Sequence, residues 1–398
     1  MSSMNNRQLF FQHLAQTSAK PIGIEVASAE GIYIKDVQGK SFIDMIAGFS
    51  VCNIGHSHPE VIKAIQEQVE KYMHIIVYGE FIQAPQVQYA KALTSELPPN
   101  LQSVYFTSSG AEATEGAMKL AKRVTKRSKI ISFIGGYHGS TQGALSVMGD
   151  EYFKNAYRPL LPQTLQLRYN NFEDLQYIDA SVACVIVEPV QAETGIIAAS
   201  KDWLAAIEKK CKEHCALLIF DEIQSGFGRT GSLFAFQSIG IVPDILLLGK
   251  ALGGGLPLGA FISHPAMMHL LTENPVLGHI TTFGGNPVSC AAGNAAFKVL
   301  KNARWIEEVA EKENMLLTQM NHSAIIHRTH RGLWMSLQFE SASLAQKIAA
   351  TCVENGIITD WFLFAEDKIR IAPPLCITTK ELQWALQQIQ LSIDQAMG

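Results

Sequence analysis

The chain has 398 residues, of which 47% are apolar and 17% are charged, and its formal net charge is −4. This length is sufficient for two or three domains, and the composition suits a large buried core. The small negative charge argues against nucleic acid as the main partner, and no apolar run is long enough to cross a membrane.

Seven cysteines are scattered along the chain, and only Cys211 and Cys215 lie close together. An odd, scattered set predicts neither a disulfide framework nor a zinc cluster. His56 and His58 have no third ligand at a suitable spacing, so no metal site is predicted. The N-terminal residues lack the apolar core of a secretory signal. We therefore expect a cytoplasmic protein.

Short strands are predicted within residues 21–46, with turns at Glu30-Gly31 and Gln38-Gly39, and a helix is predicted over 59–72. Beyond them, β-like runs alternate with helical stretches. Strands are expected at 103–107, 129–134, 182–187, 217–220 and 245–248, and helices at 111–124 and 201–214. Several of these runs are apolar throughout, as is typical of strands buried on both faces. The alternation predicts an α/β fold with a mostly parallel central sheet flanked by helices.

Residues from about 290 onward have a different character. They contain helical stretches at 288–317 and 342–355, a short strand at 368–371 and a final helix from 378. We interpret them as a smaller α+β lobe that the N-terminal strands complete. The predicted division is 1–48 for the N-terminal part of this small lobe, 49–289 for the large α/β domain and 290–398 for the C-terminal part.

Lys250 ends a short apolar segment and is followed by three glycines at 253–255. A lysine at the end of a buried strand pays a desolvation cost, which lowers its pKa and makes it a good nucleophile toward carbonyl groups. The alternative is a lysine that caps the strand and extends its ammonium group to water. This segment alone slightly favours the alternative.

Two strand-to-helix or strand-to-loop junctions suit a flat, phosphorylated ligand. The segment 107–111 (Thr-Ser-Ser-Gly-Ala) offers backbone N–H groups and a helix N-terminus to a phosphate, although serine and glycine are also ordinary capping residues. The segment 135–139 contains Tyr137, whose ring can stack on a flat ligand. The alternative for this segment is a glycine turn with a packed tyrosine.

Glu188 and Asp221 each follow a fully apolar run. A carboxylate in such a place is costly unless a cation faces it, and a protonated pyridine nitrogen would be such a cation. A salt bridge to arginine or lysine is the alternative. A phosphate cradle, an aromatic ring, an acidic strand end and a Schiff-base lysine, in this chain order, together fit pyridoxal phosphate.

The chain closely resembles the class III aminotransferases, the group of ornithine, acetylornithine and 4-aminobutyrate aminotransferases with the fold type I architecture. The resemblance extends from about Pro21 to the C-terminus. It is carried by eight ordered motifs: GHSHP at 55–59, SSGAEATEGA at 108–117, GGYHG at 135–139, VEPVQAETG at 187–195, FDEIQSGFGRTG at 220–231, GKALGGGLPLGA at 249–260, TTFGGNP at 281–287 and IRIAPPL at 369–375.

This resemblance implies catalytic roles for three residues. Lys250 would form the aldimine with the cofactor and carry the proton to and from the substrate carbon. Asp221 would face the pyridine nitrogen and keep it protonated. Tyr137 would stack on the ring face.

The resemblance also implies cofactor-binding roles. His138 would lie beside Tyr137, Gln224 would contact the ring hydroxyl, and Glu188 would belong to the hydrogen-bonded shell around Asp221. The phosphate would be held by Ser109, Gly110 and Ala111, together with Thr282 of the neighbouring subunit. The working unit would therefore be a homodimer with shared active sites.

In the substrate pocket, the resemblance implies that Arg370 binds a carboxylate and that Glu193 pairs with Arg370 while a donor presents its distal amine. A surface ion pair is the alternative for Arg370. Phe49 stands where ornithine aminotransferases have tyrosine, and Ser140 stands where many members have an arginine that binds a second carboxylate. The pocket should therefore be more apolar than a strict ornithine site.

The predicted function is transfer of the ω-amino group of an ornithine-like amino acid, free or N-acylated, to a 2-oxo acid such as 2-oxoglutarate or pyruvate. An isomerase of the same fold, of the glutamate-1-semialdehyde aminomutase type, is the alternative, because no arginine follows the turn at 137–139. A dinucleotide-binding oxidoreductase is disfavoured, because the glycines at 253–255 lack the spaced fingerprint. The presence of Lys250, Asp221 and Arg370 argues against an inactive cofactor-binding protein.

Overall fold

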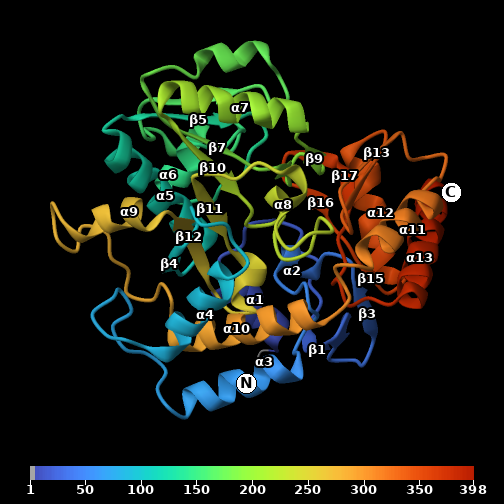
Figure 1. Cartoon of the computed structure of the whole chain (residues 1–398). Coiled ribbons are helices and arrows are strands. Elements are labelled where there is room, and N and C mark those ends of the chain that lie inside the picture. The colour runs from blue at the N-terminus through green and yellow to red at the C-terminus, as the bar shows by residue number, and fades with distance from the viewer. Residues whose placement is uncertain (1–4) are drawn as a thin grey trace.

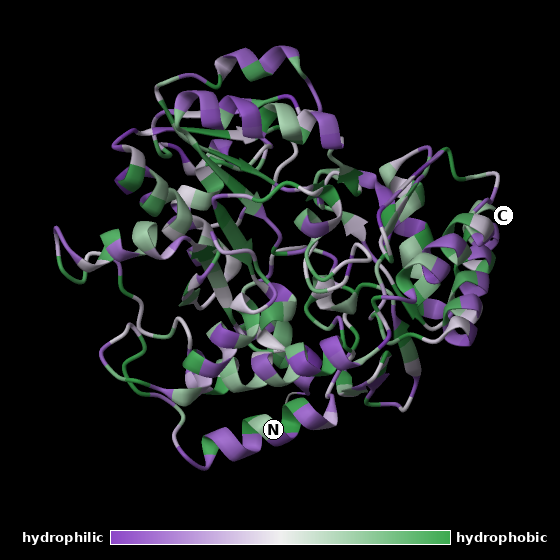
Figure 2. Cartoon of the chain, viewed as in Figure 1, coloured by the Kyte–Doolittle hydropathy of each residue, from purple (hydrophilic) through white to green (hydrophobic). Residues whose placement is uncertain are grey.

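The computed structural model describes residues 5–398, so the first four residues of the predicted segment 1–48 lie outside the described part. A large sheet with helices on both of its faces forms most of the molecule, and a smaller lobe of strands and helices lies beside it (Figure 1). In Figure 2 the strands of the large sheet are mainly hydrophobic, while the helices around it alternate between hydrophilic and hydrophobic residues.

The central sheet has seven strands in the order β4-β12-β11-β10-β7-β5-β6. Their bounds, in that order, are Ser103–Thr107, Gly259–Ser263, Ile245–Leu248, Leu217–Asp221, Val182–Val187, Lys129–Phe133 and Thr164–Leu167. β12 runs antiparallel to both of its neighbours, and the other adjacent pairs are parallel. The predicted mostly parallel sheet is thus confirmed.

Successive side chains of a strand point to opposite faces of the sheet, so a buried strand packs against helices on both faces. Cys184 and Ile186 of β7 pack in one apolar cluster with helix α5 (Gly110–Thr125). Val185 and Val187 pack in another cluster with helix α7 (Lys201–His214). Both helices begin with a serine that caps the first turn, which fixes where each helix starts behind its strand.

The small lobe is built from both ends of the chain. Its antiparallel sheet has the order β13-β14-β17-β16, with bounds His327–His330, Met335–Gln338, Ala365–Ile371 and Trp361–Phe362. A second sheet has the order β1-β2-β3-β15, with bounds Val26–Glu30, Tyr33–Asp36, Ser41–Asp44 and Ile357–Ile358. Because β3 pairs in parallel with β15, the N-terminal strands complete the C-terminal lobe as predicted.

The remaining elements connect these units. The other α-helices are α1 Asn6–His13, α2 Ala47–Ser50, α3 Pro59–Val69, α4 Ala84–Thr94, α6 Gln142–Ser146, α8 Ala235–Ile239, α9 Pro265–His269, α10 Pro287–Asn302, α11 Val309–Gln319, α12 Ala342–Glu354 and α13 Thr379–Met397. A two-stranded ribbon joins β8 Val190–Gln191 to β9 Ile197–Ala198, and 3₁₀ turns occur at Asn155–Tyr157, Glu173–Tyr177, Lys250–Gly253 and Leu270–Thr272. Within residues 5–398, no helix combines the length and apolar character needed to span a membrane.

The helical stretch predicted over 288–317 is two helices in the structure, α10 and α11. The chain leaves the first helix at Ala303, whose backbone is extended, because Trp305 and Ile306 turn inward to pack against the core. α10 packs on α3 and α4 of the large domain. The predicted boundary at 289/290 therefore falls inside a helix, and the exact domain limits stay a prediction.

The core tolerates little extra volume where α5 crosses β12. A Cβ atom on Gly116 would lie 2.3 Å from Cε1 of Phe261, a buried ring stacked on Tyr105 with centroids 4.9 Å apart. We expect Gly116→Ala to lower the free energy of unfolding by about 1–2 kcal/mol, because overpacking costs about 1–3 kcal/mol and outweighs the helix propensity gained. Denaturant unfolding measures the change.

Phe261→Leu in the same background is the control, since it removes the crowding ring atoms. The cost of Gly116→Ala should be smaller in the Phe261→Leu protein than in the wild type. Equal costs in both backgrounds would show that this contact is not responsible.

Candidate active site

The carboxyl ends of the parallel strands meet around one cavity of about 340 Å³. This is the edge at which ligands bind in open α/β sheets. Most of the predicted cofactor-binding residues line the cavity: Gly110, Ala111, Tyr137, His138, Glu188, Asp221, Gln224 and Lys250. The structure therefore brings together side chains that lie up to 140 residues apart in the sequence.

Lys250 begins the 3₁₀ turn that follows β11, with a left-handed backbone φ of 48°. Its ammonium group donates a hydrogen bond to the side-chain oxygen of Gln224. Desolvation by burial lowers the pKa of Lys250 to about 8, against the opposing influence of the Glu193 carboxylate. A substantial fraction of this amine is thus neutral near pH 8, which is the form that attacks a carbonyl carbon.

Asp221 is the last residue of β10 and is buried beside His138. Its Oδ2 lies 2.7 Å from Nδ1 of His138, and its Oδ1 accepts a hydrogen bond of 3.0 Å from the N–H of Ile223. Burial lowers the pKa of His138, but the hydrogen bond and charge of Asp221 outweigh burial and raise the pKa overall. His138 therefore holds the carboxylate in a fixed orientation at the cavity wall.

Glu188 connects two of the loops that surround the cavity. Its Oε1 accepts a hydrogen bond of 2.8 Å from the N–H of Tyr137, and its Oε2 accepts one of 3.0 Å from the N–H of Ala192. Burial raises the pKa of Glu188 to about 7. The side chain thus fixes the backbone on which Tyr137 stands.

The N-terminus of α5 forms a cradle at one end of the cavity. Ser109 is the N-cap residue and accepts a hydrogen bond of 3.2 Å from the N–H of Glu112. A Cβ atom on Gly110 would lie 2.8 Å from Ile223, and one on Gly139, where φ is 125°, would lie 2.6 Å from the Cβ of Ala111. Position 139 therefore requires glycine, whereas a side chain at position 110 would force Ile223 to move. The small residues leave the N–H groups of the first turn of α5 open to a phosphate.

Gln224 presents an unused donor to the same cavity. Its side-chain oxygen accepts from Lys250, while its Nε2 is buried and has no hydrogen-bond partner among the described residues. Such a group calls for an acceptor on a bound molecule. An anion cradle, a carboxylate, an unused amide donor and a buried amine together fit pyridoxal phosphate.

Thr282 lies in the exposed segment between β12 and α10 and is not among the residues that line this cavity. Its predicted contact is with the phosphate of a neighbouring subunit, so the role stays a prediction. Within residues 5–398, no group of three His, Cys, Asp or Glu side chains is placed to hold a metal ion. His56 instead lies 2.8 Å from Asp44, and His58 caps α3.

Arg370 of β17 is fully buried, so the interpretation as a surface ion pair is wrong. Its Nη2 donates a hydrogen bond of 2.9 Å to Oε2 of Glu193. Burial raises the pKa of Glu193, but the charges of Arg370 and Lys250, together with the hydrogen bonds that Glu193 accepts, lower it overall. The rings of Phe49 and Phe362 lie 5.0 and 4.5 Å from the guanidinium carbon.

Phe49 reaches Arg370 from an unusual backbone. Ala47, Gly48, Phe49 and Ser50 all have left-handed φ angles, between 48° and 65°. For residues with a Cβ atom this conformation costs of the order of 1–2 kcal/mol each. The turn directs the Phe49 ring, which is 44% exposed, toward the guanidinium group.

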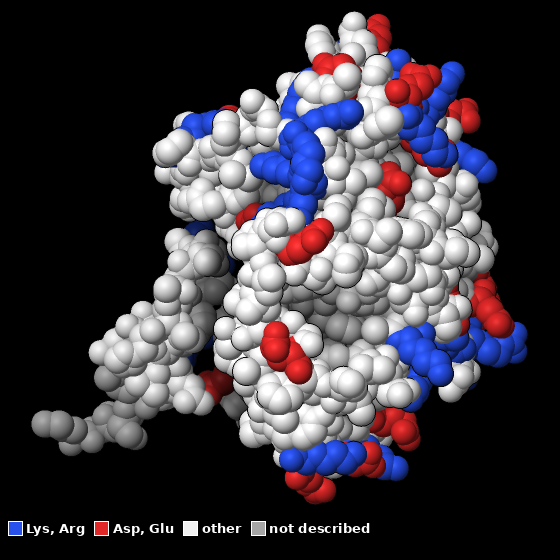
Figure 3. Space-filling view, turned by 60° about the vertical axis from the view of Figure 1, so that its left-hand side comes forward, with Lys and Arg blue, Asp and Glu red and all other residues white. Residues whose placement is uncertain are grey.

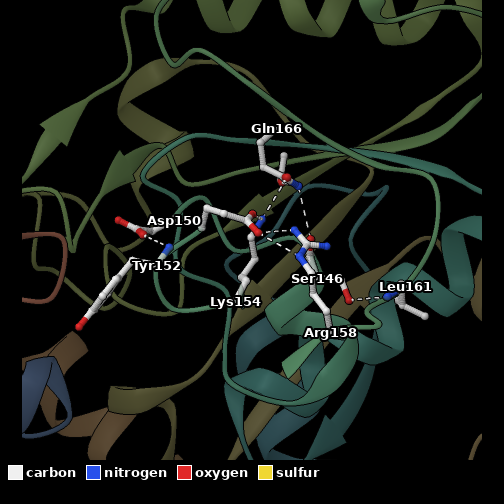
Figure 4. Close-up of polar contacts among 9 residues, drawn as sticks. Ser146, Asp150, Tyr152, Lys154, Arg158, Leu161 and Gln166 are labelled. Atoms are coloured by element: carbon white, nitrogen blue, oxygen red, sulfur yellow. Dashed lines mark hydrogen bonds and ion pairs between the residues drawn. The ribbon is translucent and has the colours of Figure 1, made fainter. Parts of the chain in front are cut away.

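An aromatic rim lies beside Tyr137. The ring of Phe364 is 6.4 Å from that of Tyr137 and 5.3 Å from that of Phe153, and the hydroxyl of Tyr137 lies 3.2 Å from that of Ser140. The loop that carries Phe153 is fixed by Lys154, which is almost completely buried and donates a hydrogen bond of 3.1 Å to Gln166 (Figure 4).

Sequence reasoning missed Asp360, Phe362 and Phe364. None of them belongs to a motif, and the two phenylalanines look like ordinary core residues. Asp360 carries only a weak form of the signal that singled out Glu188 and Asp221. It follows two isoleucines, Ile357 and Ile358, and Thr359 lies between them and the carboxylate.

Comparison with known proteins decides the family. The family described as aminotransferase class III matches residues 14–393. The chain belongs to the class III aminotransferases. Among curated members, the acetylornithine aminotransferase of Archaeoglobus fulgidus is 35% identical over 378 residues, covering 94% of this chain and 97% of the relative.

Solved structures of class III aminotransferases and related transaminases have the same fold. The ornithine aminotransferase of Toxoplasma gondii, whose active site holds pyridoxal phosphate at partial occupancy, has a TM-score of 0.90 at 28% identity and covers 98% of this chain and 95% of its own. An (S)-enantioselective ω-transaminase from Thermomicrobium roseum has a TM-score of 0.91 at 26% identity, with complete coverage of both chains. The predicted family, fold class, cofactor and transaminase activity are therefore confirmed.

Proposed function

We propose that this aminotransferase takes the ω-amino group of an ornithine-like amino acid, free or N-acylated, and passes it to a 2-oxo acid such as 2-oxoglutarate or pyruvate. The observation that carries the proposal is the buried pair of Arg370 and Glu193 near Lys250. An ω-amine has no carboxylate next to the reacting carbon, so Arg370 then needs an internal partner. A 2-oxo acid does carry a carboxylate next to the reacting carbon, and this carboxylate would replace Glu193 on the guanidinium group of Arg370.

The names of curated relatives support this choice of donor, because seven relatives at 33–36% identity to the chain are acetylornithine aminotransferases. The pocket adds a reason of its own. Phe49 beside Arg370, and the rim of Phe153 and Phe364 beside Tyr137, add apolar surface around the site. Such a surface suits the acyl group of an N-acylated donor better than a second free ammonium group.

Pyridoxal phosphate, when bound, supplies an electron sink for the carbon that carries the nitrogen. In our proposal Nζ of Lys250 would attach the cofactor and would move a proton at the carbon that carries the nitrogen. Asp221, held by His138, would keep the pyridine nitrogen protonated. Nε2 of Gln224 would donate to the ring hydroxyl, and Tyr137 would cover the ring face and exclude water from it.

At the phosphate end, the N–H groups of the first turn of α5, at Gly110 and Ala111, would bind the phosphate together with the Ser109 side chain. Turning Ser109 toward a phosphate would exchange its capping bond to Glu112 for a charge-assisted one. The exchange would not displace Tyr137 or Asp221, because Glu188 holds the backbone of Tyr137 and His138 holds the carboxylate of Asp221.

We also propose a homodimer with shared sites, to which Thr282 of each subunit contributes. Two exposed segments carry large apolar side chains, including Met73, Ile82, Val276 and Phe283. Figure 3, which brings the left-hand side of Figure 1 forward, shows a broad area without charged side chains. A surface of this kind is typical of a subunit interface.

The seven free cysteines support a reducing compartment, so we propose that the protein resides in the cytoplasm.

The test of this function is a half-reaction screen. Purified protein with bound cofactor is mixed with N-acetylornithine, ornithine or 4-aminobutyrate, and the visible absorption of the cofactor is followed. We expect N-acetylornithine to change the band fastest and a 2-oxo acid to restore it. If every ω-amino acid leaves the band unchanged, the donor class is wrong. Turnover without any oxo acid would indicate an isomerase instead.

Arg370→Ala should raise KM for 2-oxo acids by about 10- to 100-fold, because a charge-assisted bidentate contact contributes about 1.5–3 kcal/mol. Simple amines without a carboxylate should be affected much less. Steady-state kinetics with pyruvate and with a primary amine measures the difference. Arg370→Lys is the matched control: it keeps the charge but not the planar fork, and should recover only part of the affinity. An equal rise in KM for both substrates would contradict the assignment.

A further inference from the structure

Arg370 is flanked by two carboxylates. Besides Glu193 at Nη2, Asp360 places its Oδ1 at 3.5 Å from Nε, close enough for an ion pair but without a hydrogen bond. Asp360 stands between β15 and β16, and its backbone oxygen accepts a hydrogen bond of 2.9 Å from the N–H of Arg370. The two residues are therefore fixed to each other through the main chain, whereas Glu193 reaches Arg370 from a separate loop.

The surroundings leave little freedom to this group. Phe49 and Phe362 cover the guanidinium group, and Asp360 and Glu193 lie along its edges. In the part of the chain that the structure describes, Nε and Nη1 of Arg370 and Oδ1 of Asp360 are buried without hydrogen-bond partners. Arg370 thus retains binding capacity for a further acceptor, while a second carboxylate already lies beside it.

A carboxylate substrate that enters this pocket meets both charges. If it replaces Glu193, Asp360 stays in place because its backbone is bonded to that of Arg370. Two negative charges then share one guanidinium group in a buried setting, where like-charge repulsion is poorly screened. The strength of carboxylate binding must therefore depend on whether Asp360 is ionised.

Building on the proposed function, we propose that Asp360 is a positioning residue that stays paired with Arg370 through both half-reactions, and that its negative charge sets how tightly the pocket binds substrate carboxylates. With Asp360 ionised, an oxo acid binds weakly enough to be released. With Asp360 neutral, Arg370 holds carboxylates more tightly. The residue thereby determines specificity between substrates with and without a carboxylate at the reacting end.

The titration of Asp360 agrees with this role. Burial raises the pKa of Asp360 to about 6; the charge of Arg370 opposes this, and Glu193 and Asp44 reinforce it. Of these charged groups, Arg370 lies on β17, Glu193 in the loop after β8 and Asp44 on β3. The pKa of Glu193 is lowered instead, so Asp360 is the carboxylate of this cluster that takes up a proton first as the pH falls. Carboxylate binding should accordingly strengthen as the pH falls through about 6.

The experiment measures binding without turnover. The protein with bound cofactor is titrated with propionate, which has a carboxylate but no amino or oxo group, and binding is followed by the cofactor absorption and by thermal shift. Propionamide, its uncharged analogue, is the matched control. We expect propionate to bind wild-type protein more tightly as the pH is lowered from 7.5 to 5, and propionamide to show no such trend.

Asp360→Asn keeps the size of the side chain and removes its charge. It should bind propionate about 5- to 10-fold more tightly than wild type at pH 7.5, with little change between pH 5 and 7.5. KM for pyruvate should fall in parallel, while KM for a primary amine donor, which carries no carboxylate, should change much less. Asp360→Glu, which restores the charge, should return the pH dependence.

Unchanged or weaker propionate binding in Asp360→Asn would overturn the proposal, as would pH-independent binding in the wild type. The second measurement uses wild-type protein alone, so the proposal can be tested even if Asp360→Asn does not fold. The outcome is also separate from the donor assignment: propionate binding reports on Arg370 and Asp360 even if no ω-amino acid proves to be a donor.

Discussion

Replacing Lys250 by alanine should reduce kcat by more than about 10⁴-fold. The substitution removes the nucleophile that attaches the cofactor and the group that moves the proton, and acid–base catalysis alone contributes about 10²–10⁴-fold. The lowered pKa of Lys250, caused by its burial, supports both roles, because the neutral amine is the reactive form. Single-turnover kinetics with the best donor measures the loss.

Cofactor should still bind to the Lys250→Ala protein, because the cradle at Gly110 and Gly139 is independent of the lysine. Borohydride reduction should label wild-type protein at position 250 and leave the variant unlabelled. Added methylamine, a small free amine, should restore part of the activity. Full activity in the variant, or a label on another lysine, would refute the mechanism.

Asp221→Asn should reduce kcat by about 10²–10³-fold, the loss typical of removing one preorganised electrostatic contact. Asparagine has the shape of aspartate and can still accept from the N–H of Ile223, so the fold should be unaffected. What is lost is the negative charge that keeps the pyridine nitrogen protonated. The measurement is kcat for both half-reactions, with cofactor affinity determined separately.

The matched control for Asp221 is Glu222, the adjacent carboxylate. Its oxygens accept hydrogen bonds from the N–H groups of Ala235 and Phe236 at the start of α8, and it does not line the cavity. Glu222→Gln should therefore change stability more than kcat. If Asp221→Asn retained full kcat, or if the two variants lost kcat equally, the assigned role of Asp221 would be wrong.

The sequence was sufficient to predict the parts of the fold that depend on local patterns. The apolar runs at 182–187, 217–220 and 245–248 are buried strands in the structure, because a central parallel strand must be apolar on both faces. β12 (Gly259–Ser263) was not predicted. Its place between β4 and β11, antiparallel to both, is decided by tertiary pairing that no local period reveals.

The same distinction applies to the site. Residues that stand in recognisable motifs at strand ends, such as Asp221 and Lys250, could be identified because position in the sheet follows from position in the sequence. Asp360 could not be paired with Arg370 in this way. Their contact arises from the register of a short hairpin that contains an irregularity, and nothing in the spacing of ten residues indicates it.

The pairing of β3 with β15 has a consequence for how the protein is made. One strand is synthesised more than 300 residues before the other, so their pairing must wait until residues 357–358 have left the ribosome. The strands that surround the cavity around Lys250 are all translated before residue 265. The nascent chain can thus assemble its cofactor pocket well before the lobe with Arg370 closes beside it.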